Sequence, residues 1–241
     1  MNKIKRSSEL LWLFGIVFVA LGVAICSKAD LGVSMIAAPA FVVSDALAPL
    51  WSGFSVGVVE YGLQGVLLIV MCFVVGKFNW RYLLAFAVAV IYGYTLDLFL
   101  WLLGGLTFDT VAMRWVMLIV GDIITAFGVA CFFRTYMPLQ VYELFVAEVA
   151  SRFKLKLTAT KCGFDLSLLT LSVILVVVLF CGKGGFDITT IGYASFHSIG
   201  LGTLVTTAIN SPIIGFMGKM IDRFFEPTPM FPKMETALKR N

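Results

Sequence analysis

Four acidic residues interrupt the apolar stretches of this sequence and are its first candidates for chemistry. Asp122 lies ten residues into one apolar stretch, and Asp97 lies deep in another. Glu60 and Asp165 each lie near the start of theirs. A carboxylate at the centre of a bilayer costs about 2.5–3.5 kcal/mol on insertion scales, so an acid kept there is a functional candidate. These positions favour a site that binds a cation or relays protons.

Neutral polar side chains would complete such a site as hydrogen-bond partners. Tyr61 and Gln64 lie in one apolar stretch, and Asn210 lies in another. The alternative is that each acid pairs with a basic residue or caps a helix end. That alternative is weakest for Asp122, because Arg114, the basic residue on the same stretch, lies two helical turns away.

The composition predicts the environment in which these residues work. The chain has 241 residues, of which 60% are apolar and 13% are charged, and its mean hydropathy is +0.99. Soluble domains are closer to half apolar and a quarter charged. The composition therefore excludes an ordinary cytosolic enzyme, a disordered protein and a nucleic-acid-binding protein. It predicts one integral membrane domain over residues 1–241.

Six apolar stretches have about the 20 residues that a membrane-spanning helix requires. They are residues 10–27, 56–76, 82–104, 112–133, 162–182 and 200–218. Two further stretches, 33–50 and 138–153, are shorter and interrupted, the first by Pro39 and Pro49. We interpret these two as half-helices that are re-entrant or interfacial. The sequence therefore predicts an all-α membrane protein with six transmembrane helices.

The basic residues predict which side of the membrane each loop faces. Cytoplasmic loops carry the excess of Lys and Arg, and placing the N-terminus inside puts 15 of the 18 basic residues on the cytoplasmic side. Lys28, Arg114 and Lys183 then face outside. We therefore expect both termini to be cytoplasmic, with a tail at 226–241, and the first span to be retained rather than cleaved as a signal peptide.

The chain resembles itself at a fixed offset of 106 residues. Without a gap, 11 of the 63 positions in 15–77 are identical to their counterparts, and several of the matches are glycines. The order of span, broken segment, span and span also recurs in both halves. We interpret residues of about 10–105 as one repeat and residues of about 112–225 as a second.

Three crossings in each repeat would place the second copy upside down in the membrane. The expected architecture is two inverted three-helix repeats, each with a broken or re-entrant half-helix. Inverted repeats with broken helices are a recurring plan of transporters and of some channels, because they give two related states, each open to one side. The alternative is a fold doubled for stability, without a transport role.

Two short motifs resemble a known group of proteins. Residues 28–34, Lys-Ala-Asp-Leu-Gly-Val-Ser, and residues 200–203, Gly-Leu-Gly-Thr, followed by Asn-Ser-Pro at 210–212, are similar to motifs of the bacterial YczE/YyaS/YitT group of integral membrane proteins. The sequence departs from that group after Ser34, where Met35 and Ile36 replace the common Pro-Trp. The resemblance implies a multi-spanning protein of the bacterial inner membrane and supplies no catalytic residue.

Three residues at or within the spans could control access to a site. Lys28 and Arg134 end two equivalent spans, where they could form cationic gates or contact an anion near the half-helices. The alternative is that they extend to the membrane surface, as long basic side chains routinely do. Pro212 removes a backbone hydrogen bond in the last span and could serve as a hinge, or simply as a kink.

Three other ionisable residues have weaker claims. Glu143 and Glu148 lie in the second half-helix, where a helix on the membrane surface explains them, although a role in a vestibule stays open. His197 precedes the last span and could titrate near neutral pH. A single histidine at a helix start is more often structural.

The sequence contains no motif that points to an enzyme. It has no nucleotide-binding loop, no H-E-x-x-H and no G-x-S-x-G, and its single His and scattered Cys residues form no metal-ligand pattern. We therefore expect no enzymatic activity, no cofactor and no bound metal. Energy, if used, would come from an ion gradient or from a partner protein.

The sequence thus supports three hypotheses. The first is a secondary transporter of a small polar or cationic solute, coupled to protons, with Asp122, Asp97 and Glu60 as its central acids. The second is a non-transporting accessory protein that regulates another membrane protein. The third is a passive channel. The expected partners are the lipid bilayer and a small molecule or ion, with a homo-oligomer or a membrane-protein partner left open, and no nucleic acid.

Overall fold

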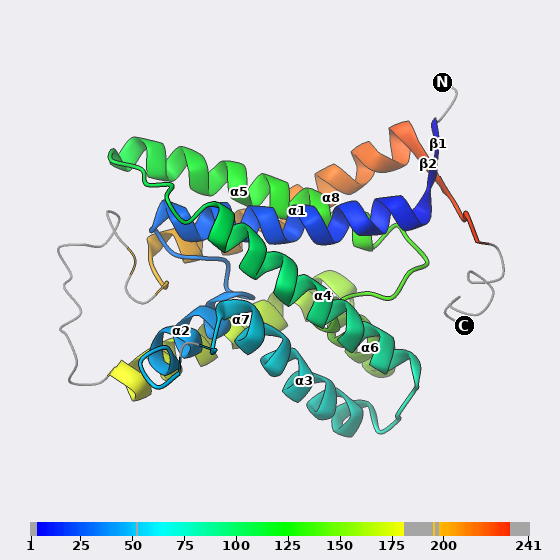
Figure 1. Cartoon of the computed structure of the whole chain (residues 1–241). Helices are drawn as coiled ribbons and strands as arrows, with labels where there is room; N and C mark the ends of the chain where they lie inside the picture. Colours follow the sequence, from blue (N-terminus) through cyan, green and yellow to red (C-terminus); the bar gives the residue numbers. More distant parts are fainter. Residues whose placement is uncertain (1–3, 52, 181–194, 196–197, 232–241) are drawn as a thin grey trace.

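A computed structural model describes residues 4–51, 53–180, 195 and 198–231 as helices, connections and one short pair of strands (Figure 1). The elements in chain order are β1 (Ile4–Ser7), α1 (Ser8–Ala29), α2 (Ala38–Leu47), α3 (Val56–Val75), α4 (Arg81–Leu102), α5 (Val111–Phe132), α6 (Val141–Phe153), α7 (Leu157–Phe180), α8 (Leu201–Phe224) and β2 (Phe225–Thr228).

Six of these helices are long and apolar enough to cross a membrane. They are α1, α3, α4, α5, α7 and α8, which have 20 to 24 residues each. Their outward faces carry large apolar side chains, among them Phe73, Trp101 and Val178, of which 82%, 76% and 69% is exposed. Such a surface suits hydrocarbon rather than water. The predicted all-α membrane fold with six spans is confirmed.

Local signals in the sequence explain where the spans begin and end. Ser7, Ser55 and Thr110 precede α1, α3 and α5, and each side-chain oxygen accepts a hydrogen bond from a backbone N–H in the first turn. These caps satisfy donors that a helix leaves unpaired at its start. Gly76 ends α3 in the left-handed conformation, with φ of 69°, which glycine adopts readily.

The two interrupted stretches form short helices. α2 has 10 residues and α6 has 13, so neither is long enough to span a bilayer. The order long, short, long, long therefore occurs twice along the chain. Each short helix packs against the second long helix of the other half: α2 contacts α7, and α6 contacts α3.

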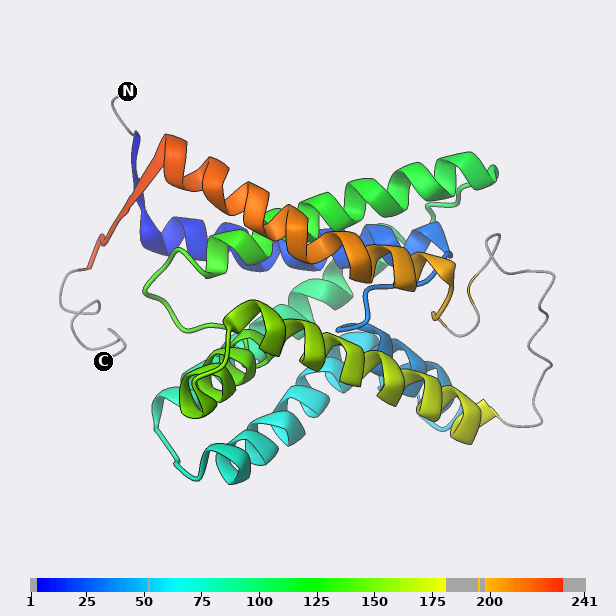
Figure 2. The same cartoon turned by 180° about the vertical axis from the view of Figure 1, so that it is seen from behind.

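α1 and α5 cross at the centre of the molecule and run in opposite directions (Figures 1 and 2). Gly15 faces Gly128 and Gly22 faces Gly121, with backbones so close that a Cβ on Gly22 would lie 2.5 Å from the Gly121 carbonyl oxygen. Only small residues permit this approach. The close crossing fixes the two halves of the chain against each other.

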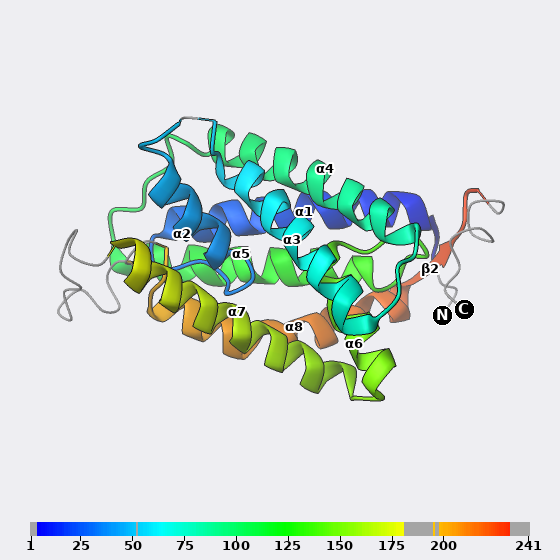
Figure 3. The same ribbon diagram turned by 90° about the horizontal axis from the view of Figure 1, so that it is seen from below.

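The helices form two layers. In Figures 1 and 2, α1, α5 and α8 lie side by side above α2, α3, α6 and α7, and α4 runs obliquely across both. The largest buried apolar cluster lies between the layers and includes residues of α1, α2, α3, α4, α5 and α6. Viewed from below, α2 and α6 lie toward opposite ends of the lower layer (Figure 3).

The two ends of the molecule differ. The strand end carries the parallel pair β1–β2, in which Ile4 aligns with Phe225 and Ser7 with Thr228, together with the start of α1, the α3–α4 turn and the end of α8. The Glu9 carboxylate accepts hydrogen bonds from the backbone N–H groups of Met230 and Phe231 there. The opposite end carries the end of α1, the α4–α5 connection and the start of α8.

Candidate functional site

A small cavity lies between the two halves of the chain. Its volume is about 30 Å³, which is room for about two water molecules. Apolar side chains of α1 and α5 form one wall. The polar side chains come from both halves: Ser34, Glu60, Tyr92, Thr125, Gln140, Tyr142, Glu143, Lys161 and Asn210.

The starts of both short helices border this cavity. Ala37, directly before α2, and Gln140, directly before α6, line it. In α2 the Ala38 and Ala40 N–H groups donate to the Ser34 and Ala37 carbonyl oxygens, and in α6 the Val141 N–H donates to a side-chain oxygen of α3. The fold therefore brings the starts of both short helices, one from each half, to the polar side chains of the cavity.

Glu60 is the acid of α3 in this cavity, and only 1% of it is exposed. Its Oε1 accepts a hydrogen bond from the Gln64 amide nitrogen at 3.4 Å, and the Tyr142 hydroxyl donates to the carboxyl group. Oε2 has no hydrogen-bond partner among the residues that the structure describes. A buried carboxylate left in this way is costly unless it takes up a proton or a cation.

Gln64 connects Glu60 to the start of α6. It is fully buried, and its Oε1 accepts a hydrogen bond from the Val141 backbone N–H at 3.3 Å. The amide therefore satisfies one donor of the α6 start while its NH₂ group holds Glu60. The predicted role of Gln64 as a neutral partner of an acid has a direct geometric basis here.

Glu143 lies in the first turn of α6, a helix outside the six spans, and also lines the cavity. Burial raises the pKa of its carboxyl group to about 7, against the opposing effect of the Lys161 ammonium group. Its Oε2 has no hydrogen-bond partner within the described part of the chain. Glu143 is therefore buried against the cavity, whereas a helix on the membrane surface would leave it exposed.

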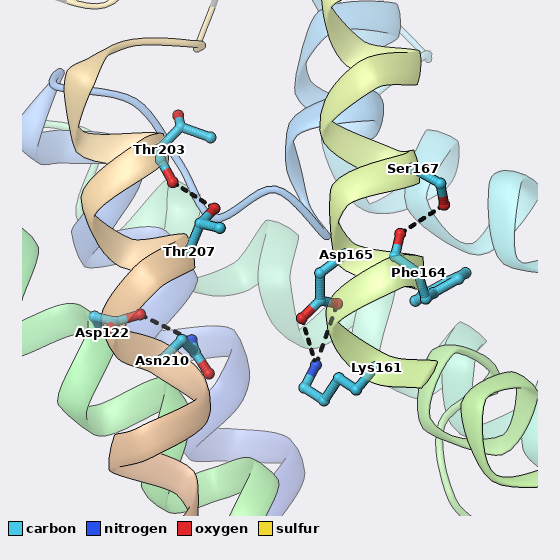
Figure 4. Close-up of polar contacts among 8 residues, drawn as sticks. All are labelled: Asp122, Lys161, Phe164, Asp165, Ser167, Thr203, Thr207 and Asn210. Atoms are coloured by element: carbon cyan, nitrogen blue, oxygen red, sulfur yellow. Dashed lines mark hydrogen bonds and ion pairs between the residues drawn. The ribbon is translucent and has the colours of Figure 1, made fainter. Parts of the chain in front are cut away.

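Lys161 and Asp165 form an ion pair one turn apart on α7 and extend toward α8 (Figure 4). The Lys161 Nζ lies 3.2 and 3.1 Å from the two carboxyl oxygens of Asp165, and the two side chains are only 15% and 8% exposed. Asp165 thus pairs with a basic residue, which is the alternative that the sequence left open for each acid. Lys161 itself lines the cavity instead of lying in a surface loop.

Asp122 and Asn210 form a second polar pair, between α5 and α8 (Figure 4). The Asn210 amide donates to Asp122 Oδ1 at 2.8 Å, and Asn210 lines the cavity. Asp122 is 1% exposed, and its Oδ2 has no hydrogen-bond partner in the described residues. Two predicted site residues from distant spans are therefore in direct contact.

Asp97 and Tyr61 lie elsewhere. The Asp97 carboxylate accepts hydrogen bonds from the Ser55 hydroxyl at 2.6 Å and from the Gly57 backbone N–H at 2.8 Å, at the start of α3. This is the geometry of a helix cap. The Tyr61 ring packs near the Tyr94 ring, with centroids 6.1 Å apart. Neither Asp97 nor Tyr61 lines the cavity.

The residues considered for gating make contacts at the two ends. Lys28 donates from Nζ to the Gly104 carbonyl oxygen at 3.5 Å. Arg134 forms a two-pronged ion pair with Asp222 of α8, at 2.7 and 2.8 Å. α8 continues as a helix through Pro212. His197 lies outside the described residues.

Two larger grooves open at the strand end. One, of about 580 Å³, lies between α7 and α8 and is lined by Thr158, Lys161, Ser211, Ile214 and Gly215 among others. Lys161 and Ile214 also line the central cavity, so the groove and the cavity adjoin. The second, of about 630 Å³, lies between the α3–α4 turn and α6 and includes Glu148.

The two sequence motifs meet at the opposite end of the molecule. The Gly202 N–H donates to the Leu31 carbonyl oxygen at 2.8 Å, and the Val33 N–H donates to the Ser198 carbonyl oxygen at 2.9 Å. A Cβ on Gly202 would lie 2.6 Å from that Leu31 oxygen, so the backbones touch. We call this contact, residues 30–34 against 198–203, the seal.

Sequence reasoning missed Lys161, Tyr142 and the burial of Glu143. The sequence places Lys161 among the basic residues of the cytoplasmic side. The signal was its position four residues before Asp165 at the start of an apolar stretch, a spacing that places both on one helix face. Tyr142 carried no comparable signal, because an isolated tyrosine in a short helix has many ordinary roles.

No metal site is evident in the described ranges, since no group of three or more His, Cys, Asp or Glu side chains converges there. In comparisons with known proteins, residues 4–219 match a family described as a family of unknown function, DUF6198. No curated protein and no solved structure matches the chain.

Proposed function

This membrane-spanning helical chain belongs to the DUF6198 family, and we propose that it is a secondary transporter that moves a small polar or cationic solute in exchange for, or together with, protons. The finer resemblance to the YczE/YyaS/YitT group, and with it a place in the bacterial inner membrane, forms part of the same proposal.

One observation carries the proposal: two buried carboxyl groups of the cavity are only partly compensated by their neighbours. Glu60 and Glu143 come from different halves of the chain, and each has an oxygen without a hydrogen bond in the described structure. Protons neutralise them while no cation is present. An incoming cation would displace a proton, and this exchange couples the two fluxes.

The helix contacts support an inverted repeat. A two-fold axis through the α1–α5 crossing would relate Gly15 to Gly121 and Gly22 to Gly128, and it requires each to face the other's counterpart, as the contacts do. The same axis would exchange α2 with α6 and α3 with α7, consistent with the contacts α2–α7 and α3–α6. Transporters of this plan bind solute where the repeats meet.

The difference between the two ends supports one direction of opening. The strand end holds most of the described basic residues, among them Lys77, Arg81, Arg152 and Lys219, so we assign it to the cytoplasm together with both termini. The α7–α8 groove adjoins the cavity from this side. The described conformation is then open toward the cytoplasm and closed at the seal.

Proton flux in proteoliposomes tests the proposal. Vesicles with a trapped pH-sensitive dye receive a gradient of sodium, potassium, guanidinium or choline chloride. We expect at least one cation to drive saturable proton movement, and Glu60→Gln to abolish it. Glu148→Gln is the matched control, because Glu148 lines the groove between the α3–α4 turn and α6 and not the cavity.

The other outcomes separate the remaining hypotheses. Flux that does not saturate and ignores the pH gradient would indicate a passive channel. No flux with any solute, together with a membrane protein that co-purifies, would indicate an accessory protein. Asp122→Asn extends the test to the second polar pair: we expect it to fold in membranes and to lose flux, and unchanged flux would remove Asp122 from the site.

A further inference from the structure

Lys161 occupies the boundary between the groove and the cavity. Among the described residues it is the one charged side chain that lines both spaces. Its neighbour at this boundary, Ile214 of α8, is apolar. Any solute that passes from the groove to the cavity therefore passes the Lys161 ammonium group.

Acidic groups surround this ammonium group from two helices. Both oxygens of Asp165 contact it at about 3 Å from one turn along α7. Glu143 of α6 lies within electrostatic range of both Lys161 and Asp165, and its Oε2 is buried without a hydrogen bond in the described structure. Two carboxyl groups thus face one ammonium group.

The position of that ammonium group has the properties of a cation site. An ammonium ion offers compact positive charge and several N–H donors, and carboxylate oxygens accept them in short charge-assisted bonds. The Lys161 side chain reaches the site on a flexible four-carbon stem, which can also extend along the adjoining groove. The lysine can therefore enter and leave the site without a change in the backbone of α7.

We infer that Lys161 fills, with its own ammonium group, a site for a small primary ammonium ion that enters through the α7–α8 groove. This inference rests on the proposed transport function, since it specifies the ligand class of the same cavity. A free ammonium ion binds Asp165 and Glu143 after the Lys161 side chain moves into the groove. The small cavity selects against bulky quaternary ions.

Binding of methylammonium to Lys161→Ala tests the inference. The variant removes the tethered ammonium group and leaves the acids. We expect methylammonium chloride to raise the melting temperature of the purified variant saturably and to bind about tenfold or more tightly than to the wild type, where Lys161 competes. Choline chloride at the same ionic strength should have no such effect. Lys156→Ala, an exposed lysine before α7, is the matched control.

The double variant Lys161→Ala with Asp165→Asn locates the site. We expect it to lose the methylammonium response, because one of the two acids has become neutral. The inference is overturned if Lys161→Ala responds equally to methylammonium and choline, or if the double variant responds like the single one. These outcomes leave proton flux in the wild type unaffected, so they are distinguishable from failure of the transport proposal.

A thiol probe covers the case in which Lys161→Ala does not fold. Lys161→Cys, with Cys162 replaced by Ser, keeps a side chain at this boundary. We expect a cationic aminoethyl methanethiosulfonate to modify it about tenfold faster than the anionic sulfonatoethyl reagent, because the flanking acids attract positive charge. Equal rates, or faster reaction with the anion, would overturn the inference.

Discussion

At each end of the molecule, the connection before a short helix meets the start of a long helix, and the two ends differ in how closely these segments pack. At the seal, the connection before α2 lies directly on the start of α8, where Gly200 and Gly202 let the backbones touch. At the strand end, the connection before α6 meets the start of α4, where Trp80 and Tyr82 stand in place of small residues, and a groove of about 630 Å³ remains.

The helix pairs follow the same division. α3 and α4 are in close contact near the seal, where a Cβ on Gly57 would lie 2.1 Å from the Gly93 carbonyl oxygen. α7 and α8 are separated by the other groove, and Gly215 on its wall has no atom within 4 Å of an added Cβ. Glycine thus marks a closed contact at one end and open space at the other.

The largest effect is expected from Gly202→Leu, which breaks the seal. Its side chain would overlap the Leu31 carbonyl oxygen and a Leu118 methyl group, and overpacking of this kind costs about 1–3 kcal/mol or more. Thermal unfolding in detergent measures the loss. Gly215→Leu on the same helix is the control, and we expect it to change stability little. Equal losses in both variants would contradict the difference between the two ends.

The second prediction concerns the groove at the strand end. Gly215→Trp should fold normally and reduce flux by about tenfold or more, because the indole fills the space beside Lys161 through which solute reaches the cavity. Proteoliposome flux and thermal unfolding are measured together. Full flux with a correctly folded variant would mean that solute does not use this groove.

Asp97→Ala should affect stability rather than transport. The variant loses the acceptor of two hydrogen bonds at the start of α3, and loss of a helix cap costs about 0.5–2 kcal/mol. Flux per folded molecule should stay at the wild-type level. A variant of normal stability without flux would contradict this role and would support Asp97 as one of the central acids of the transport site.

The smallest effects are expected from two partly exposed ion pairs among the described residues, one at each end. Arg114 pairs with Asp30 at 3.4 Å near the seal, and Arg134 pairs with Asp222 at the strand end. Each pair is partly exposed, so Asp30→Asn and Asp222→Asn should each cost about 0.2–1 kcal/mol and be less sensitive to salt than the wild type. A loss of flux in Asp222→Asn without a loss of stability would instead support a gate at Arg134.

The sequence predicted the helices well because they depend on local signals. Length, hydropathy and the prolines of 33–50 were enough to separate six spans from two short helices. Asp122 and Asn210 were each identifiable as polar residues inside apolar spans, but their contact follows from the packing of α5 against α8.

The cavity depended on packing that no local pattern records. From the sequence alone, Glu143 is expected on the surface, but the packing of α6 against α3 and α4 buries it. Lys161 is expected to mark the cytoplasmic side, but its position on α7 places it in the cavity lining. Asp97 lies within an apolar stretch, as a central acid would, but its place near the end of α4 brings it to the start of α3 instead. The inverted relation of the halves and the orientation in the membrane stay predictions.

The proposed transport requires the seal to open, and a cross-link beside it tests this most directly. Asp30 of the seal accepts a hydrogen bond at 2.6 Å from the hydroxyl of Ser195, three residues before the α8 side of the seal. The cross-link uses Asp30→Cys with Ser195→Cys in a chain whose five native cysteines are replaced. We expect oxidation to abolish the wild-type proton flux and a reductant to restore it, while each single variant stays active. Unchanged flux in a fully cross-linked protein would contradict opening of the seal during transport.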